Sequence, residues 1–353
     1  MTSCRRRIRR STGRGRDGGT EAARQGLMLA HRLAVTTAVA TVVLIVFGGL
    51  VTNTGAALAV PDWPRTFGHN MFLFPWSGMV GGVFYEHSHR LLGALVGLLT
   101  VALAAALWPR GGRLRVLGVV AVAVVIAQGV IGGLRVILLT DVLAMVHGPL
   151  AQGFFALIAA LAFLTAPAAA RPGLVADAPV RRLAILAVAA LYAQIVLGAL
   201  LTHAGWLWLH LAGAVAVFAV VPIVTARVRR TGDVVAIPLS RALLALLGVQ
   251  LALGVGAYLA RFSSIWIPGE QLTMLMLPVA HRLVGGLLLA ASVVLTLRLW
   301  TVAAAENGPS ASLPRSRRPA AYAAYASAVD SLGASHLDRS RRPTSTGVPE
   351  GSA

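Results

Sequence analysis

The stretch FYEHSHRLLGALVGLL, residues 84–99, places Glu86, His87, His89 and Arg90 at the start of a long apolar run. An ionisable side chain inside a lipid bilayer is costly unless it is paired with an opposite charge or bound to a ligand. Such a cluster at the edge of an apolar run therefore predicts a functional site rather than an ordinary helix surface.

A shorter version of this stretch, LPVAHRLVGGLLLA, lies at residues 277–290. It repeats the pair His89-Arg90 as His281-Arg282, again beside a long apolar run. We therefore expect the two His-Arg pairs to belong to related sites.

The composition of the chain is that of a polytopic membrane protein. Of its 353 residues, 57% are hydrophobic and 12% are charged, whereas about a quarter of the residues of soluble domains are charged. The net charge of +19 comes from Arg in the tails and between apolar runs, a pattern that indicates membrane topology and no nucleic-acid partner. With Cys4 as the only cysteine, metal binding would depend on histidine.

Eight apolar runs are long enough to cross a membrane, which takes about 20 helical residues. We expect an all-α protein with transmembrane helices near residues 33–53, 84–108, 116–136, 142–166, 182–202, 206–226, 241–260 and 276–300. The first run is long enough to span, so it predicts a retained helix rather than a cleaved signal peptide.

The connections between these runs alternate in charge. Arg is frequent in both tails and at residues 110–115, 171–182 and 227–230, and rarer in the other connections. Because Arg-rich loops stay on the cytoplasmic side, we expect a multi-pass protein of the cell membrane, in contact with lipid, with both termini in the cytoplasm.

The runs also repeat. Odd-numbered runs contain Gln followed four residues later by Gly, and the first run, at residues 43–50, has the glycines without the Gln. The three pairs are Gln128/Gly132, Gln194/Gly198 and Gln250/Gly254. Glycine at one-turn spacing favours close helix packing in lipid, and we interpret these glycines in that way.

Each odd-numbered run, together with the histidine-bearing run that follows it, forms a hairpin that recurs four times. Runs 1–4 and 5–8 enter the membrane in the same sense and predict two like four-helix halves, residues 33–166 and 182–300. A basic cytoplasmic tail, residues 1–32, precedes them, and we expect a disordered cytoplasmic tail at residues 303–353.

Four histidines stand at similar depth, one near the start of each even-numbered run: His89, His147, His210 and His281. Any one of them could simply hydrogen-bond a neighbouring carbonyl. Four in register within a repeat instead predict two sites with two ligands each, because imidazole binds haem iron and helical bundles present such ligands from facing helices.

Residues three apart on a helix share a face, so we expect Glu86 to lie on the side of His89 and assign His87 a structural role. Glu86 has Pro278 as its counterpart in the second copy. A partly buried carboxylate can move protons, which favours a reaction in the first half. The alternative is that Glu86 stabilises the fold as a partner of Arg90.

Arg90 and Arg282 follow their histidines directly. A guanidinium group suits planar carboxylates, so these side chains could bind haem propionates. The alternative is that they extend to the lipid headgroups. The connection at residues 54–83 also carries Trp63, Phe72 and Trp76, which suit a membrane interface or a cap over a cofactor pocket.

At these residues the chain resembles the haem A synthase family of cytochrome oxidase assembly. The resemblance rests on GGLVTNTGAALAVPDWP at residues 48–64, EHSHR at residues 86–90, single histidines opening runs 4 and 6, and HRLVGG at residues 281–286. It extends over all eight runs, and the combination is more specific than any one string. Some members of the family carry a cysteine pair in the first outer loop, which this chain lacks.

The resemblance implies an oxidoreductase that converts the ring-D methyl group of haem O to a formyl group through a hydroxymethyl stage. It implies that His89 and His147 flank the substrate haem O, that His210 and His281 ligate a haem b, and that Glu86 is the essential acid. The partners implied are a haem O synthase and an unidentified electron donor, and assembly of several copies stays open.

Two other functions are compatible with four histidines in register. A non-catalytic di-haem electron carrier of the b type would hold two haems of fixed composition. A haem-binding transporter or assembly scaffold would move its two halves about a central site. The first copy has a carboxylate, Glu86, where the second copy has Pro278, and this difference favours an enzyme over the other two functions.

Overall fold

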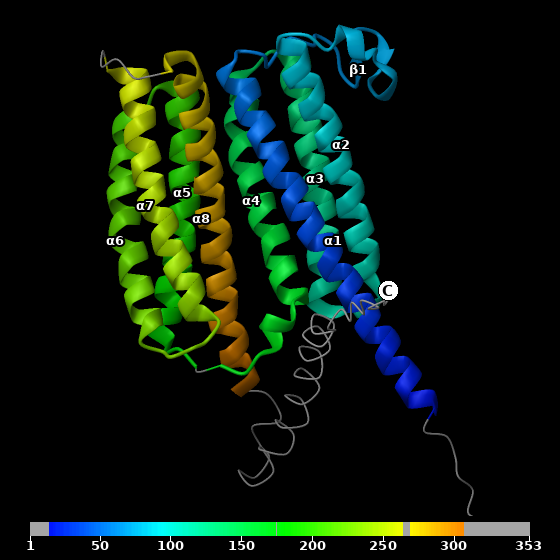
Figure 1. The fold of residues 1–353 in the computed structure, drawn as a ribbon, viewed down its shortest axis with the longest axis vertical. Helices are drawn as coiled ribbons and strands as arrows, with labels where there is room; N and C mark the ends of the chain where they lie inside the picture. Colours follow the sequence, from blue (N-terminus) through cyan, green and yellow to red (C-terminus); the bar gives the residue numbers. More distant parts are fainter. Residues whose placement is uncertain (1–13, 174, 264–268, 307–353) are drawn as a thin grey trace, which may run out of the picture.

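Eight long helices form the part of the chain that the computed structural model describes, residues 14–173, 175–263 and 269–306 (Figure 1). All are long and apolar enough to cross a membrane, which confirms the predicted fold class. They are α1 (Arg14–Asn53), α2 (Gly82–Leu107), α3 (Gly112–Leu138), α4 (Asp141–Thr165), α5 (Ala178–Ala204), α6 (Leu207–Arg229), α7 (Ala236–Phe262) and α8 (Glu270–Glu306).

The helices pack in two groups of four. Helices α1–α4 surround one buried apolar cluster (Figure 1). Helices α5–α8 surround another, which also includes Ala156 of α4. The groups meet where α4 contacts α5 and α8, and where α1 contacts α8. The division of the chain into two halves at residues 166–182 stays a prediction. The likeness of the halves stays a prediction.

Two helices extend further than the apolar runs suggested. Helix α1 begins at Arg14, so the second part of the segment predicted as a tail is helical. Near the end of this segment the helix packs against α4: Ala30 is buried, and Nδ1 of His31 lies 3.0 Å from the carbonyl oxygen of Ala162. Helix α8 continues to Glu306, and the predicted disorder beyond that residue falls outside the described residues.

The connection between α1 and α2 forms a small cap at one end of the bundle (Figure 1). Two short antiparallel strands, β1 (Arg65–Thr66) and β2 (His69–Asn70), precede two 3₁₀ turns, Met71–Leu73 and Trp76–Gly78. Two further 3₁₀ turns, Trp108–Arg110 and Pro167–Ala170, follow α2 and α4.

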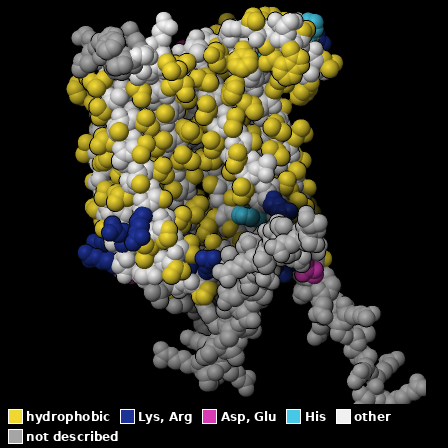
Figure 2. All heavy atoms as spheres, viewed as in Figure 1, with side chains coloured by type: hydrophobic (Ala, Val, Ile, Leu, Met, Phe, Trp, Pro, Cys, Tyr) yellow, Lys and Arg dark blue, Asp and Glu magenta, His cyan; other side chains and the backbone are white. Residues whose placement is uncertain are grey.

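The distribution of side chains on the surface is typical of a membrane protein. Apolar side chains cover the middle of the face in Figure 2, and Arg side chains gather toward the end opposite the cap. Exposed arginines at connections on that end are Arg113, Arg115, Arg182, Arg229 and Arg230. Arg at one end of a bundle marks the cytoplasmic side, which is the basis of the orientation expected from the sequence.

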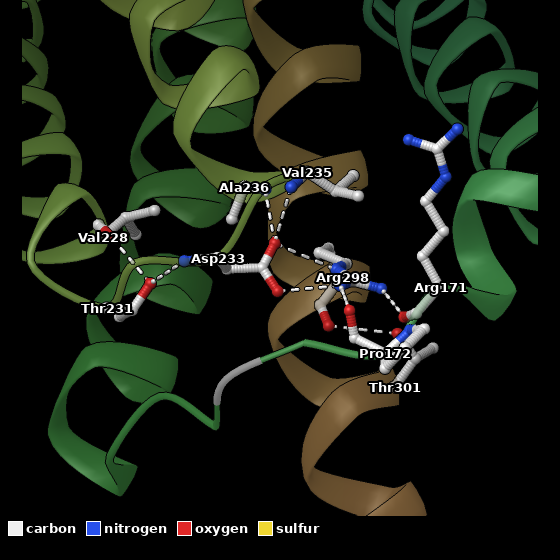
Figure 3. Close-up of polar contacts among 9 residues, drawn as sticks. All are labelled: Arg171, Pro172, Val228, Thr231, Asp233, Val235, Ala236, Arg298 and Thr301. Carbon is white, nitrogen blue, oxygen red and sulfur yellow. Dashed lines mark hydrogen bonds and ion pairs between the residues drawn. The ribbon is translucent and has the colours of Figure 1, made fainter. Parts of the chain in front are cut away.

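A buried ion pair joins α8 to the connection between α6 and α7 (Figure 3). Nη2 of Arg298 lies 2.8 Å from Oδ2 of Asp233, and the two side chains are 0% and 1% exposed. Arg298 also donates to the carbonyl oxygens of Arg171 and Pro172, at 2.6 and 3.1 Å. One guanidinium group therefore holds two connections to α8, a feature that the apolar pattern did not indicate.

Candidate functional site

The four predicted histidines form two pairs. In each pair, the two rings come from different even-numbered helices. The ring centres of His89 on α2 and His147 on α4 are 6.4 Å apart, with an angle of 71° between the ring planes. The corresponding values for His210 on α6 and His281 on α8 are 6.2 Å and 70°. The pairs combine the residues that the matched depth predicted, and they have nearly the same geometry.

A glycine of the preceding helix lies against each imidazole. A Cβ atom added to that glycine would approach Cε1 of the ring to 3.0–3.3 Å, closer than ordinary van der Waals contact. The contacts are Gly48 with His89, Gly132 with His147, Gly198 with His210 and Gly254 with His281. The interpretation of these glycines as backbone packing alone was therefore incomplete, because they make room for the rings.

The glutamine of the repeat contacts three of the four histidines, and in two of them, His210 and His281, it reaches the ring. Nε2 of Gln128 donates to the carbonyl oxygen of His147 at 3.1 Å, and Nε2 of Gln194 donates to that of His210 at 2.9 Å. Nε2 of Gln250 lies 3.2 Å from Nε2 of His281. The glutamine four residues before each of these glycines therefore contacts the histidine of the next helix. This spacing was visible in the sequence.

The ring nitrogens offer a test of whether the pairs fit haem iron. Nδ1 of His89, His147 and His281 is buried and makes no hydrogen bond of ordinary geometry. Two imidazoles that bind one iron from opposite sides, with bonds of about 2 Å, hold their ring centres roughly 6 Å apart. Both pairs have this separation, and unpartnered buried nitrogens suit a ligand, so the residues fit an axial pair.

The described residues contain no group of three or more His, Cys, Asp or Glu side chains that could hold a metal ion. A haem iron needs only two axial side chains from the protein, because the porphyrin supplies its other four ligands. Binding of iron by these histidines therefore stays a prediction.

Glu86 is turned toward the cap rather than left free. Its Oε1 lies 2.7 Å from Nη2 of Arg90, and its Oε2 accepts a hydrogen bond from the backbone N–H of Val60 at 2.9 Å. The side chains of Glu86 and Arg90 are 5% and 10% exposed. This geometry favours the alternative in which Glu86 stabilises the fold, while its role as an acid stays a prediction.

Arg90 binds the main chain of the cap. It donates to the carbonyl oxygens of Val60, Asp62 and Arg65 at 3.0, 2.7 and 3.0 Å. Together with Glu86, these acceptors engage both terminal nitrogens of the guanidinium group. In this arrangement Arg90 orders the connection between α1 and α2 and is not directed at a propionate.

Asp62 completes the cap. Its carboxylate accepts hydrogen bonds from the backbone N–H groups of Phe67 and Gly68, both at 2.8 Å. Burial alone would raise the pKa of Asp62, but these bonds and the charge of Arg90 hold it below its ordinary value. The carboxylate is therefore ionised at neutral pH and keeps the turn closed.

His87 has the structural surroundings predicted for it. It is 1% exposed, its Nδ1 lies 3.1 Å from Oγ1 of Thr66, and its ring centre is 5.1 Å from that of Phe74. It therefore joins the start of α2 to the cap, away from the pair formed by His89 and His147.

The aromatic residues of the cap divide into two kinds. The indole of Trp63 lies directly on Gly133 of α3, where a Cβ atom would overlap it. Phe72 and Trp76 are 65% and 82% exposed and suit a membrane interface. Trp63 thus fastens the cap across the end of α3.

Two further arginines lie near the histidines. Nη2 of Arg282 is 3.5 Å from Oγ1 of Thr202. The charge of Arg135, at the end of α3, acts on His147 and on His203. Arg135 was not among the predicted site residues, although its place at the end of an apolar run was visible in the sequence.

Two comparisons with known proteins bear on this site. A family model described as "Cytochrome oxidase assembly protein" matches residues 76–207. The Heme A synthase of Shouchella clausii (strain KSM-K16) is 35% identical over 105 residues, which make up 29% of this chain and 34% of the relative. Both matches support the haem A synthase family. The family match includes Glu86, His89 and His147 and ends before His210.

Proposed function

We propose that the chain is a haem A synthase, an oxidoreductase that converts the ring-D methyl group of haem O to a formyl group. The observation that carries this proposal is the pair of histidine sites with matched ring separations of 6.4 and 6.2 Å. The partial similarity to a Heme A synthase supports the same function.

The proposed conversion is a four-electron oxidation of one carbon atom. The first stage replaces a C–H bond of the methyl group by a C–O bond, and the second removes two hydrogens from the hydroxymethyl group. Each stage takes two electrons from the carbon. A bound haem would supply the redox chemistry. Dioxygen would provide the oxygen atom of the new C–O bond and accept the electrons taken from the carbon, and an electron donor in the membrane would supply the two further electrons that each dioxygen molecule needs to release water.

The histidines of the two halves would hold different haems. His89 and His147 would hold haem O, and His210 and His281 would hold a haem b. Arg135 and Arg282 would bind carboxylate groups near these pairs, because a guanidinium group suits planar carboxylates. Glu86 and Arg90 keep the cap fixed over the first pair, and Glu86 is the buried acid nearest in sequence to His89.

The proposed setting is the cell membrane, with both termini in the cytoplasm. The Arg side chains at the end opposite the cap support this orientation (Figure 2). The histidine pairs would then lie toward the outer face, with the cap beside the first pair. A haem O synthase would supply the substrate.

The decisive experiment is conversion of haem O in cells. The chain is expressed together with a haem O synthase under aerobic conditions, and extracted haems are analysed by mass. Haem A is expected with the wild-type chain and not with His89→Ala. Recovery of only haems B and O from wild-type cells would contradict the proposal.

The near identity of the two histidine pairs also favours a second candidate, a b-type electron carrier with two similar haems. The two candidates differ in their need for Glu86. In an electron carrier, Glu86→Gln would leave haem spectra and electron transfer unchanged, whereas in the enzyme it would reduce haem A formation.

A further inference from the structure

A shallow groove lies between α2 and α3, near the end of the bundle opposite the cap. Its volume is about 500 Å³, which is within the range of ligand pockets. The residues that line it are Val101, Ala104, Ala105, Trp108, Val119 and Val122. These side chains offer no carboxylate, imidazole or thiol that could ligate a metal or a haem iron, so the groove suits a hydrocarbon chain.

Small residues produce this groove. Gly118 of α3 faces α2, and a Cβ atom there would stand 3.3 Å from Cα of Ala104, so the two helix backbones approach closely at this point. The short side chains of Ala104 and Ala105 leave a hollow beside Val119, and Trp108 lines it where α2 ends. Ala105, Trp108 and Val119 are exposed, so in a membrane the groove opens toward lipid.

An arginine is fixed at the end of the groove. Nε of Arg115 donates to the carbonyl oxygen of Trp108 at 3.0 Å, and the guanidinium carbon lies 5.0 Å from the centre of the indole, a distance typical of a cation–π contact. In the described part of the chain, the two terminal nitrogens of this group make no hydrogen bond or ion pair with the protein. They are therefore available to a phosphate group, whose oxygens match the planar fork of Arg.

The charge at this end of the groove is positive and has no local compensation. Arg110 and Arg113 belong to the same connection as Arg115, and no Asp or Glu occurs in the sequence between Glu86 and Asp141. A neutral lipid or a quinone would gain nothing from these charges. An anionic phospholipid fits both features, because basic pockets between transmembrane helices bind anionic headgroups.

We propose that the groove between α2 and α3 binds a phospholipid with an anionic headgroup. One acyl chain lies in the groove along Ala105, and the phosphate group binds Arg115 beside the indole of Trp108. His89 is near the opposite end of α2, so this lipid site is separate from the histidine pairs and does not depend on the proposed haem chemistry.

The test compares two phospholipids that differ in the charge of the headgroup. The purified full-length protein is washed free of lipid in detergent and titrated with phosphatidylglycerol or phosphatidylcholine of the same acyl chains, and bound lipid is measured by native mass spectrometry. Wild type is expected to bind phosphatidylglycerol about fivefold more tightly, the effect of one arginine beside an anionic headgroup. Equal affinity for the two lipids would overturn the proposal.

Two variants locate the site. Arg115→Gln is expected to abolish the preference for phosphatidylglycerol, and Ala105→Phe is expected to weaken the binding of both lipids by filling the groove. An unchanged preference in Arg115→Gln would overturn the proposal. Unchanged binding in Ala105→Phe would overturn it too, so either variant decides if the other does not fold.

Each variant has a matched control. Ala102→Phe adds the same ring to an exposed position of α2 that does not line the groove, and Arg182→Gln removes an exposed arginine at the start of α5. Both controls are expected to bind the two lipids like wild type. Equal losses in the variants and in their controls would assign the effect to general membrane contacts and contradict a specific site.

Discussion

The imidazole of His89 lies against Gly48, with so little room that a Cβ atom on the glycine would stand 3.0 Å from Cε1 of the ring. The same contact recurs at Gly254 and His281, also at 3.0 Å. Because it recurs in both helix groups, we regard it as part of each histidine site.

Gly48→Ala should therefore displace the ring of His89 and weaken haem binding in the first half only. After purification, the haem content should fall toward one haem per chain, and the spectrum of the haem held by His210 and His281 should be unchanged. Gly97→Ala is the control, because a Cβ atom there meets nothing within 4 Å. Equal haem content in both variants would show that the contact does not matter.

Arg90→Lys should loosen the cap. Lysine keeps the charge but cannot present the planar fork that reaches Val60, Asp62 and Arg65. Breaking a buried pair by removing one partner costs roughly 3–5 kcal/mol, and this milder change should cost less. Limited proteolysis between α1 and α2 should become faster than in wild type, and an unchanged rate would mean that the cap is held by other contacts.

Glu86→Gln separates the two roles of this side chain. The charge opposite Arg90 is lost, but the amide still offers an oxygen to the backbone N–H of Val60, and Arg90 keeps its three carbonyl acceptors, so the cap should stay closed. If Glu86 is the acid, haem A formation should fall sharply with unchanged proteolysis of the cap. A parallel loss of both would assign Glu86 to positioning alone.

The ion pair between Asp233 and Arg298 should make stability depend on pH. Burial alone would raise the pKa of Asp233, but the hydrogen bond from Arg298 and those from the backbone of Ala236 and Val235 lower it below 3.8. Its contribution to stability is therefore fully present above the ordinary pKa and is lost as the pH falls through the lower, folded value. Thermal unfolding in detergent should show this loss only in strongly acidic buffer.

Asp233→Asn removes the charge that compensates Arg298. Removing one partner of a buried ion pair costs about 3–5 kcal/mol, so the variant should unfold at a lower temperature at neutral pH and lose the acid dependence. Asp233→Leu combined with Arg298→Met should recover much of the stability, because apolar replacements of both partners are often tolerated. No difference between the single and double variants would contradict this account of the pair.

The interface between the two helix groups offers another test. The amide oxygen of Gln152 on α4 lies so close to Gly286 on α8 that a Cβ atom there would overlap it. Gly286→Ala should lower the unfolding temperature, and adding Gln152→Ala should restore it by making room. Gly248→Ala, with nothing within 4 Å of the added atom, should have little effect.

Much of the architecture was readable from the sequence, because run length and polarity decide which helices can cross a bilayer. The equal depth of the four histidines in the repeat predicted two pairs, and the family resemblance named His147 as the partner of His89. The turn of Glu86 toward Val60 could not be predicted, because it depends on the path of the chain between α1 and α2. The pair formed by Asp233 and Arg298 was also missed, because their proximity is a tertiary contact without a local signal.

The most direct measurement is the haem composition of purified wild type, His89→Ala and His281→Ala, each produced together with a haem O synthase. Wild type should contain haem b and a haem of the O or A type. His89→Ala should lose the O- or A-type haem and keep haem b, and His281→Ala should lose haem b. Wild type with haem b alone, or the same loss in both variants, would contradict two distinct histidine sites in a haem A synthase.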